Sequence, residues 1–345
     1  GWVVLWPAKH VAGRGRAGLA GRVRTGGGIV LGGRDVTVGP ESLGGEEGGD
    51  DLGRGDGGVP WAGIVEGEVG ESDNAIYVHE NLDELERADR EVFPIARYYG
   101  DILKADRRWT AVVASRGCRR ECAYCAAAAL SGGSFRTRSV ESVLNELTRL
   151  RRDHELTGVY LEDDNLLLDR PGLEALLEAL ARRNPGLALE LPNGLDPMLL
   201  DSELLEAMAA AGVTALSLGI ETTIEDNQRF LKRPLDPGHL DAVLRACRAL
   251  GLRTTGYLLV GLPHDSPAAL AKMFRQVKAM HLDLAHVSRY EPLPSTAHAA
   301  RRALRVATGG FYLYFYADPS RLASVVRQGA SLASIGRRYA HWLLR

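Results

Sequence analysis

The chain has 345 residues, of which 45% are hydrophobic and 25% are charged, and its formal net charge is −2. This composition is typical of a globular protein with a sizeable core, and the nearly balanced charge gives no electrostatic reason to expect a nucleic-acid partner. No apolar run is long enough to cross a bilayer, and the first residues show neither a charged leader nor a cleavage site. We therefore expect a cytoplasmic protein that has no membrane partner.

Glycine dominates the beginning of the chain, where 22 of the 40 glycines lie in the first 70 residues. That stretch has little helical or strand periodicity, and such a composition struggles to offset the entropy of ordering. We therefore expect residues 1–75 to be either disordered or an incomplete domain. Residues 76–108 are expected to form a linker.

From Trp109 onward, short apolar stretches alternate with amphipathic helical patterns. The helical patterns repeat apolar residues with a period of 3.6, and Asp201 and Ser266 are predicted to cap two of the helices. The six stretches expected as strands are 110–115, 158–162, 187–191, 214–220, 253–261 and 284–290. Strands that alternate with helices predict an α/β fold with right-handed parallel crossovers. Six units are too few for a complete eight-stranded barrel, so the sequence predicts a partial (β/α)6 barrel over residues 109–296, followed by a helical extension over 297–345.

Three of the four cysteines, Cys118, Cys122 and Cys125, form a CxxxCxxC pattern directly after the first predicted strand. In parallel α/β sheets, the chemistry is carried by loops at the carboxyl edge of the strands. Three thiolates on one loop can bind three corners of a cube-shaped cluster and leave one iron open to an exogenous ligand. Structural zinc is the alternative, but it requires four ligands, and the nearest histidine, His154, lies within the next predicted helix. Cys247 stands alone on a predicted amphipathic helix and is expected to pack in the core.

The CxxxCxxC pattern after the first strand of a six-unit barrel, with Tyr124 before the last cysteine, resembles the radical S-adenosylmethionine (SAM) superfamily. The resemblance covers roughly residues 109–296. It implies a 4Fe–4S cluster on the three cysteines, with the open iron chelated by the amino and carboxylate groups of SAM. It also implies that an electron from the cluster cleaves SAM into methionine and a 5′-deoxyadenosyl radical, so that the cofactors supply the chemistry. The implied partners are a small-molecule substrate and a reducing electron donor such as flavodoxin or ferredoxin.

The ends of the later strands extend the resemblance. The segment "EDDN" resembles the loop that binds the amino group of SAM, and its carboxylates and amide can accept hydrogen bonds from an ammonium group. An Asp/Asn-rich turn is the alternative interpretation of that segment. The family's usual "GFPGET" is replaced by "GLPHDS", so no acidic contact is assigned at that point. The residues that the resemblance places around SAM, in addition to Tyr124, are Asp163, Asp164, Asn165, Asn193, Glu221, Gly256 and Gly261.

Two further segments, "RYEPLPST" and "GFYLYFYADPSRL", resemble the radical SAM branch that carries an N-terminal cobalamin-binding domain. That branch includes methyltransferases and ring-forming enzymes of tetrapyrrole synthesis, so the resemblance implies methyl transfer or cyclisation on an unknown substrate, with unknown catalytic residues. Cobalamin is then a possible third cofactor, although residues 1–75 are too few for a complete domain of that kind, and the "AKHVAG" motif around His10 has Ala where Asp is expected. The alternatives are a non-catalytic zinc or iron–sulfur protein and an inactive fragment of a cobalamin-dependent enzyme.

Overall fold

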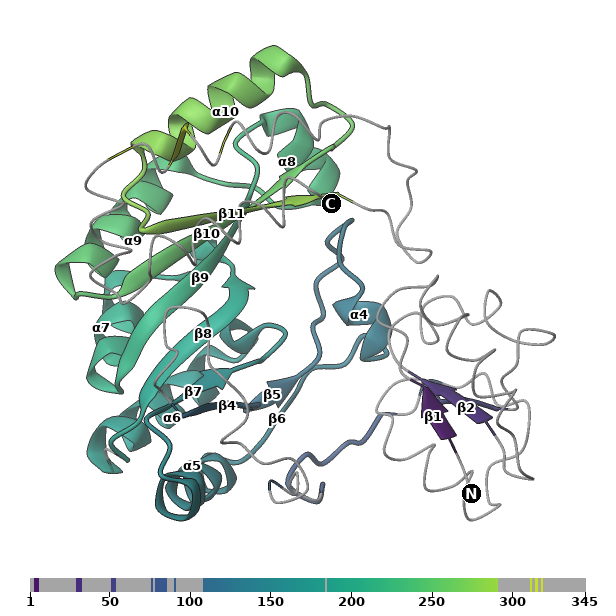
Figure 1. Cartoon of the computed structure of the whole chain (residues 1–345), viewed down its shortest axis with the longest axis vertical. Coiled ribbons are helices and arrows are strands. Elements are labelled where there is room, and N and C mark those ends of the chain that lie inside the picture. The colour runs from purple at the N-terminus through teal and green to yellow at the C-terminus, as the bar shows by residue number, and fades with distance from the viewer. Residues whose placement is uncertain are drawn as a thin grey trace. The chain divides into compact units, whose positions relative to one another are not determined.

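The structure is a computed structural model, in which the chain forms two compact units. The described residues are 3–5, 29–32, 51–53, 76, 78–85, 90, 108–183, 185–290, 311, 314–315 and 318. One unit comprises Gly1–Leu85, Arg116–Arg136 and Pro292–Ala299, and the other comprises Glu86–Ser115, Thr137–Glu291 and Ala300–Arg345. Each unit contains a parallel sheet (Figure 1).

The larger unit is built on a six-stranded parallel sheet in the order β11-β10-β9-β8-β7-β4. Its strands are β4 (Trp109–Val112), β7 (Gly158–Leu161), β8 (Ala188–Leu195), β9 (Val213–Glu221), β10 (Arg253–Val260) and β11 (Leu284–Arg289). Within this sheet, strands that follow each other along the chain are also neighbours in space, as in a barrel that has not closed. The predicted α/β class, the six strands and the partial barrel are confirmed.

Helices connect the strands and cover one face of the sheet (Figure 1). They are α5 (Val140–His154), α6 (Arg170–Arg183), α7 (Ser202–Ala210), α8 (Glu225–Leu231), α9 (Pro237–Ala249) and α10 (Pro267–Ala279), with 3-10 turns η4 (Leu166–Leu168) and η5 (Pro197–Leu199). Both predicted caps are confirmed: Asp201 accepts a hydrogen bond from the Leu204 N–H at 2.8 Å, and Ser266 accepts one from the Ala269 N–H at 3.2 Å. No helix among the described residues is both long and apolar enough to span a bilayer.

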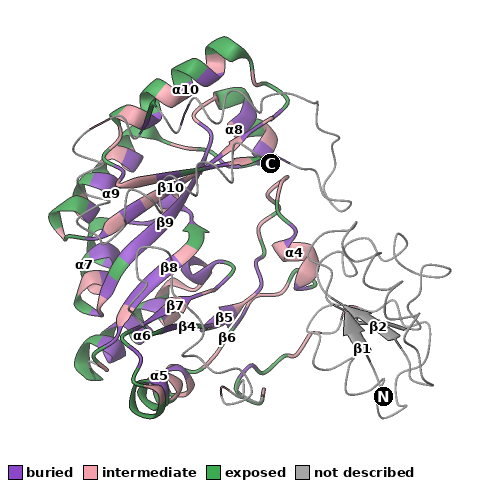
Figure 2. Cartoon of the chain, in the orientation of Figure 1, coloured by how far each residue is buried: buried purple, intermediate pink, exposed green. Residues whose placement is uncertain are grey.

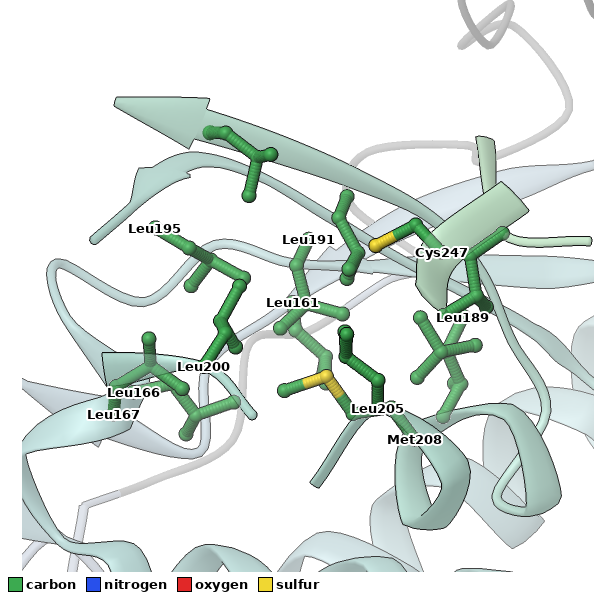
Figure 3. Close-up of a cluster of buried hydrophobic side chains, with 14 of the residues drawn as sticks. Leu161, Leu166, Leu167, Leu189, Leu191, Leu195, Leu200, Leu205, Met208 and Cys247 are labelled. Carbon is green, nitrogen blue, oxygen red and sulfur yellow. The ribbon is translucent and has the colours of Figure 1, made fainter. Parts of the chain in front are cut away.

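The hydrophobic core lies between the sheet and these helices, where the buried positions gather (Figure 2). The side chains of Leu204, Leu205 and Met208 on α7 are fully buried. Cys247 on α9 belongs to the buried hydrophobic cluster (Figure 3), and burial raises the pKa of this thiol to about 12. The predicted packing role of Cys247 is therefore confirmed.

The smaller unit contains a second parallel sheet, in the order β1-β2-β3. These three short strands are β1 (Val3–Leu5), β2 (Ile29–Gly32) and β3 (Asp51–Gly53). Parallel pairing is the arrangement expected of an α/β segment. His10 lies outside the described residues, and the predicted domain boundaries at residues 75 and 108 stay predictions.

Two aromatic residues beyond β11 belong to the core of the larger unit. Phe311 and Phe315 are helical and buried, and the Phe311 ring packs against Phe274 of α10 with ring centroids 4.5 Å apart. Phe311 and Phe315, the two phenylalanines of the "FYLYFY" segment, thus pack in the core of the larger unit. The rest of the predicted extension over residues 297–345, apart from Tyr314 and Asp318, lies outside the described residues.

Candidate active site

Asp163 lies directly beyond β7 and binds the end of the neighbouring strand β4. Its Oδ1 accepts hydrogen bonds from the backbone N–H groups of Ala114, at 3.0 Å, and of Ser115, and from the Ser115 hydroxyl at 2.7 Å. Arg138 binds the same stretch from its carbonyl side, since its guanidinium donates to the Val113 carbonyl at 2.9 Å. The backbone that leads into the cysteine segment is therefore held on both its N–H and its C=O groups.

The second carboxylate oxygen of Asp163 is buried, yet it has no hydrogen-bond partner among the described residues. Burial raises the pKa of this carboxyl to about 6, against the three hydrogen bonds to Oδ1, which lower it. A buried acceptor without a partner is costly, so such a group in a native site calls for an explanation. An ammonium group from a ligand would supply both the missing donor and the compensating charge.

The remaining polar residues of the "EDDN" loop and Asn193 lie around Asp163. The Asn193 amide donates to the Asp163 carbonyl at 3.2 Å. Asn193 lies in β8 where the register with β9 shifts, and such a bulge redirects a side chain. Asn165 is buried and Asp164 is exposed. Glu162 was missed from the sequence: burial raises its pKa, against a hydrogen bond with Asn193, which lowers it.

Glu221 ends β9 in a strained conformation. Its φ is 59°, a left-handed value that costs a residue with a side chain roughly 1–2 kcal/mol, and its side chain is buried. Two other buried charged residues lie at this strand end. The Arg233 guanidinium donates to the Gly219 carbonyl at 3.0 Å and lies 3.3 Å from an oxygen of Asp196. Nothing in the sequence singled out Arg233 and Asp196, because the short helix α8 that leads into Arg233 was not predicted.

The two glycines that the resemblance places around SAM have different structural roles. Gly256 lies within β10, and a Cβ there would meet Leu282 at 2.8 Å and Ile220 at 3.0 Å, so core packing by itself requires a glycine. Gly261 follows the strand with φ of 87°, and a Cβ added there would have Arg289 as its nearest described neighbour, at 3.6 Å. The left-handed backbone of Gly261, rather than lack of space, requires glycine at this strand exit.

The three cysteines lie in the smaller unit, on a segment that closes on itself. Gly117, directly before Cys118, has φ of 89°, and a Cβ there would lie 2.2 Å from the Ser134 carbonyl oxygen and 2.7 Å from the Ser131 Cβ. The residues before and after the cysteines are therefore packed together. Between them, the Cys125 N–H donates to the Cys122 carbonyl at 3.1 Å and forms a tight turn.

None of the three cysteines of this segment forms a disulfide with a described residue, and two of them accept hydrogen bonds from backbone N–H groups. The Arg120 N–H donates to the Cys118 sulfur and the Ala127 N–H donates to the Cys125 sulfur, both at 3.4 Å. A cysteine binds metal as the thiolate, and a thiolate sulfur accepts hydrogen bonds of this kind. Cys118 is buried, Cys122 and Tyr124 are half-buried, and Cys125 is exposed. Among the described residues, no group of three or more His, Cys, Asp or Glu is arranged around a single metal ion.

Comparison with known proteins identifies the fold that carries these residues. Residues 112–277 match the model of the radical SAM superfamily. Residues 112–277 form a radical SAM domain. The resemblance inferred from the cysteine spacing is thus confirmed over these residues, and the superfamily is one whose members use a 4Fe–4S cluster and SAM. The ligand and contact residues named for them stay predictions.

Individual relatives agree with this assignment. Cytidylyl-2-hydroxyethylphosphonate methyltransferase from Streptomyces wedmorensis is 29% identical over 150 residues, which are 43% of this chain and 28% of the relative. Anaerobic magnesium-protoporphyrin IX monomethyl ester cyclase from Rubrivivax gelatinosus is 22% identical over 243 residues, or 67% and 41% of the two chains. The chain therefore spans less than half the length of either relative.

A solved structure shows the same fold. It is the radical SAM methyltransferase TsrM from Kitasatospora setae with cobalamin and a [4Fe–4S] cluster bound, which superimposes with a TM-score of 0.66 over 85% of this chain and 63% of TsrM. The sequence identity is 17%, so the likeness concerns the fold.

Proposed function

We propose that this chain is a radical SAM enzyme that reductively cleaves SAM and uses the resulting radical for methyl transfer or cyclisation on a small molecule. When bound, the 4Fe–4S cluster and SAM supply one-electron cleavage of a carbon–sulfur bond, which yields methionine and a 5′-deoxyadenosyl radical. The chain's own residues bind these cofactors, orient SAM and exclude water around it. Cys118, Cys122 and Cys125 would hold the cluster.

The observation that carries the proposal is the Asp163 carboxylate. One oxygen holds the backbone that leads into the cysteine segment, and the other is buried without a partner in the described part of the chain. In the proposed enzyme, this second oxygen accepts the ammonium group of SAM. The fit is chemical, because the site offers an acceptor and a negative charge where the ligand brings donors and a positive charge.

Two further residues at the same strand edge, Arg233 and Glu221, complement the carboxylate end of SAM. The Arg233 guanidinium is buried and adds a positive charge beside the strained end of β9. The Glu221 backbone is held in a left-handed conformation, and strain of this kind concentrates at binding sites. We infer that Glu221 and Arg233 orient SAM from the β9 side, while Asp163 and Asn193 orient it from the β7 and β8 side.

The two reactions in the proposal, methyl transfer and cyclisation, are those named for the relatives. One relative is named a phosphonate methyltransferase and another a tetrapyrrole ester cyclase, so both reactions belong to the proposal. Either reaction consumes an electron, which we propose comes from flavodoxin or ferredoxin. Cobalamin enters the proposal through TsrM, whose structure contains it, and residues 1–75 would have to bind it.

The test is anaerobic reconstitution with iron and sulfide, followed by addition of SAM and dithionite and measurement of 5′-deoxyadenosine. We expect several irons per chain, with matching sulfide, and 5′-deoxyadenosine only in the presence of reductant. Loading of iron and sulfide without cleavage of SAM would overturn the catalytic proposal. Stoichiometric zinc without sulfide would favour a non-catalytic metal protein.

The fourth cysteine provides a matched control for the metal ligands. Single Cys→Ala changes at 118, 122 and 125 should each abolish 5′-deoxyadenosine formation and lower the iron content. Cys247→Ala removes a thiol that is buried in the core, so it should cost some stability but leave iron content unchanged. Equal iron loss in all four variants would mean that the cysteines matter only for folding.

A further inference from the structure

The short helix α8 lies between the ends of β9 and β10 in the chain, and it carries a fully buried asparagine. Asn227 is 0% exposed, although asparagine is usually found at the surface. A buried amide must satisfy both its donor and its acceptor to avoid a large desolvation cost. The hydrogen-bond partners of Asn227 therefore indicate the role of this residue.

Both partners of Asn227 lie on the loop that follows β10. The Asn227 amide nitrogen donates to Oδ1 of Asp265 at 2.7 Å, and the Asn227 oxygen accepts from the His264 N–H at 3.1 Å. These residues are 38 and 37 positions away along the chain. The side chain of one helix thus binds a loop from the next unit of the barrel.

Asp265 in turn binds the backbone directly after β10. Its Oδ2 accepts from the Gly261 N–H at 2.7 Å and from the Leu262 N–H at 3.0 Å. Burial raises the pKa of this carboxyl, against these hydrogen bonds and the one from Asn227, which lower it. The residue is the Asp of "GLPHDS", where the sequence pattern assigned no acidic contact, and the structure gives it the backbone of its own loop as a partner.

The residue next to Asn227 binds the other strand exit. The Gln228 amide donates to the Thr222 carbonyl at 3.3 Å, directly after Glu221, and its oxygen accepts from the Leu235 N–H at 3.4 Å. Consecutive residues of α8 therefore bind the exits of both β9 and β10. At this end of the two strands the register of their pairing shifts, so the sheet alone does not align the exits.

We propose that Asn227 and Asp265 form a positioning pair, which holds the β10 exit at Gly261 and Leu262 in a fixed place relative to the β9 exit at Glu221. The inference rests on the proposed function, because the resemblance places Glu221 and Gly261, at these two exits, around SAM. Neither Asn227 nor Asp265 needs to touch the cofactor. The pair acts by preorganising two short backbone segments that do.

The donors and acceptors of the pair permit a sharp test by exchange. In Asn227→Asp, two carboxylate oxygens face each other. In Asp265→Asn, the single amide oxygen at position 265 cannot accept both from Asn227 and from Gly261 and Leu262, so its NH2 group faces another donor. In the double variant, the carboxylate at position 227 accepts from the His264 N–H and from the amide at position 265. The oxygen of that amide accepts in turn from Gly261 and Leu262. The exchange therefore restores every hydrogen bond with the direction of the central one reversed.

The experiment measures SAM binding to the reconstituted protein, together with backbone amide exchange at Gly261 and Leu262 in the absence of SAM. We expect each single variant to weaken SAM binding by about tenfold or more and to accelerate exchange at both amides. The double variant should recover to within about threefold of the original chain, because coupled residues are not additive. Asp226→Asn is the matched control, since Asp226 precedes Asn227 on α8 but is exposed and paired with Arg229.

The outcomes separate the two proposals. If the unaltered chain fails to bind SAM, the proposed function is wrong, whatever the variants do. If the unaltered chain binds SAM and both single variants bind it equally well, the positioning pair is wrong and the proposed function stands. The pair is also overturned if the double variant is as weak as the sum of the single variants.

Discussion

Ser115 donates two hydrogen bonds to Oδ1 of Asp163, one from its backbone N–H and one, at 2.7 Å, from its hydroxyl. This contact joins the exits of β4 and β7, and it leaves Oδ2 of the same carboxylate buried without a partner among the residues that the structure describes. Oδ1 is thus bound within the fold, and Oδ2 is available to a ligand. Its protonation should therefore be visible both in stability and in cofactor binding.

The first prediction concerns pH. Burial raises the pKa of Asp163 to about 6, above its ordinary value of 3.8. A carboxyl group whose pKa rises on folding contributes stability that is fully present below the unfolded pKa and is lost as pH rises through the folded pKa. Without SAM, we expect the unfolding free energy of the chain to fall by up to about 3 kcal/mol, relative to Asp163→Asn, between about pH 4 and pH 7. Urea denaturation of both proteins across this range measures the difference.

Binding of SAM should show the opposite trend, because an ammonium group binds the ionised carboxylate. We expect SAM affinity to rise as pH increases through about 6, and Asp163→Asn to remove this dependence together with most of the affinity. Parallel pH profiles for the two proteins would contradict the assignment of the amine contact to Asp163.

The second prediction concerns the glycine before the first cluster cysteine. Gly117→Ala places a Cβ at 2.2 Å from the Ser134 carbonyl oxygen, so the cysteine segment cannot close as it does now. We expect this variant to lose most of its reconstituted iron, measured with acid-labile sulfide. Gly133→Ala is the control, because Gly133 also has a positive φ, of 73°, but a Cβ there would meet no described atom within 4 Å. It should lose about 1 kcal/mol of stability and keep its iron.

The third prediction concerns a partly buried ion pair that spans one strand. Glu190 of β8 and Arg253 of β10 both lie opposite Ala215 of β9, and an alanine leaves room for their side chains to meet at 2.6 Å. Arg253→Met leaves a buried carboxylate without this cation and should destabilise the chain by about 3 kcal/mol in urea denaturation. The double variant Glu190→Gln with Arg253→Met should recover much of that loss. A double variant as unstable as the single one would contradict this account.

The fourth prediction separates backbone strain from side-chain function at Glu221. Its φ of 59° suits glycine better than any residue with a Cβ. We therefore expect Glu221→Gly to be more stable than Glu221→Ala by about 1 kcal/mol, because both lack the carboxylate and only alanine retains the strain. Both variants should bind SAM less tightly than the unaltered chain. Equal stability of the two variants in urea would show that the site does not enforce this backbone conformation.

Sequence reasoning predicted most of the fold. The six strands, the helices between them and the caps Asp201 and Ser266 follow from patterns within a few neighbouring residues, since periodicity and capping are local. The short helix α8 escaped prediction, because its seven residues are too few to show a 3.6-residue period. The candidate site was only partly predictable: Asp163, Asn193 and Glu221 were identified through a family resemblance, whereas Arg233 and Asp196 carried no such pattern.

The sequence alone determined that three cysteines with CxxxCxxC spacing follow the first strand of a parallel barrel, because spacing and strand order are properties of the chain. Only the tertiary structure decided which polar groups meet. Asp163 binds Ser115 across 48 positions, Asn227 binds Asp265 across 38, and Arg253 binds Glu190 across 63. Such contacts depend on how neighbouring strands end beside each other. For that reason, only the pairing of β4 with β7 shows that one oxygen of the Asp163 carboxylate is bound by the fold and the other is not.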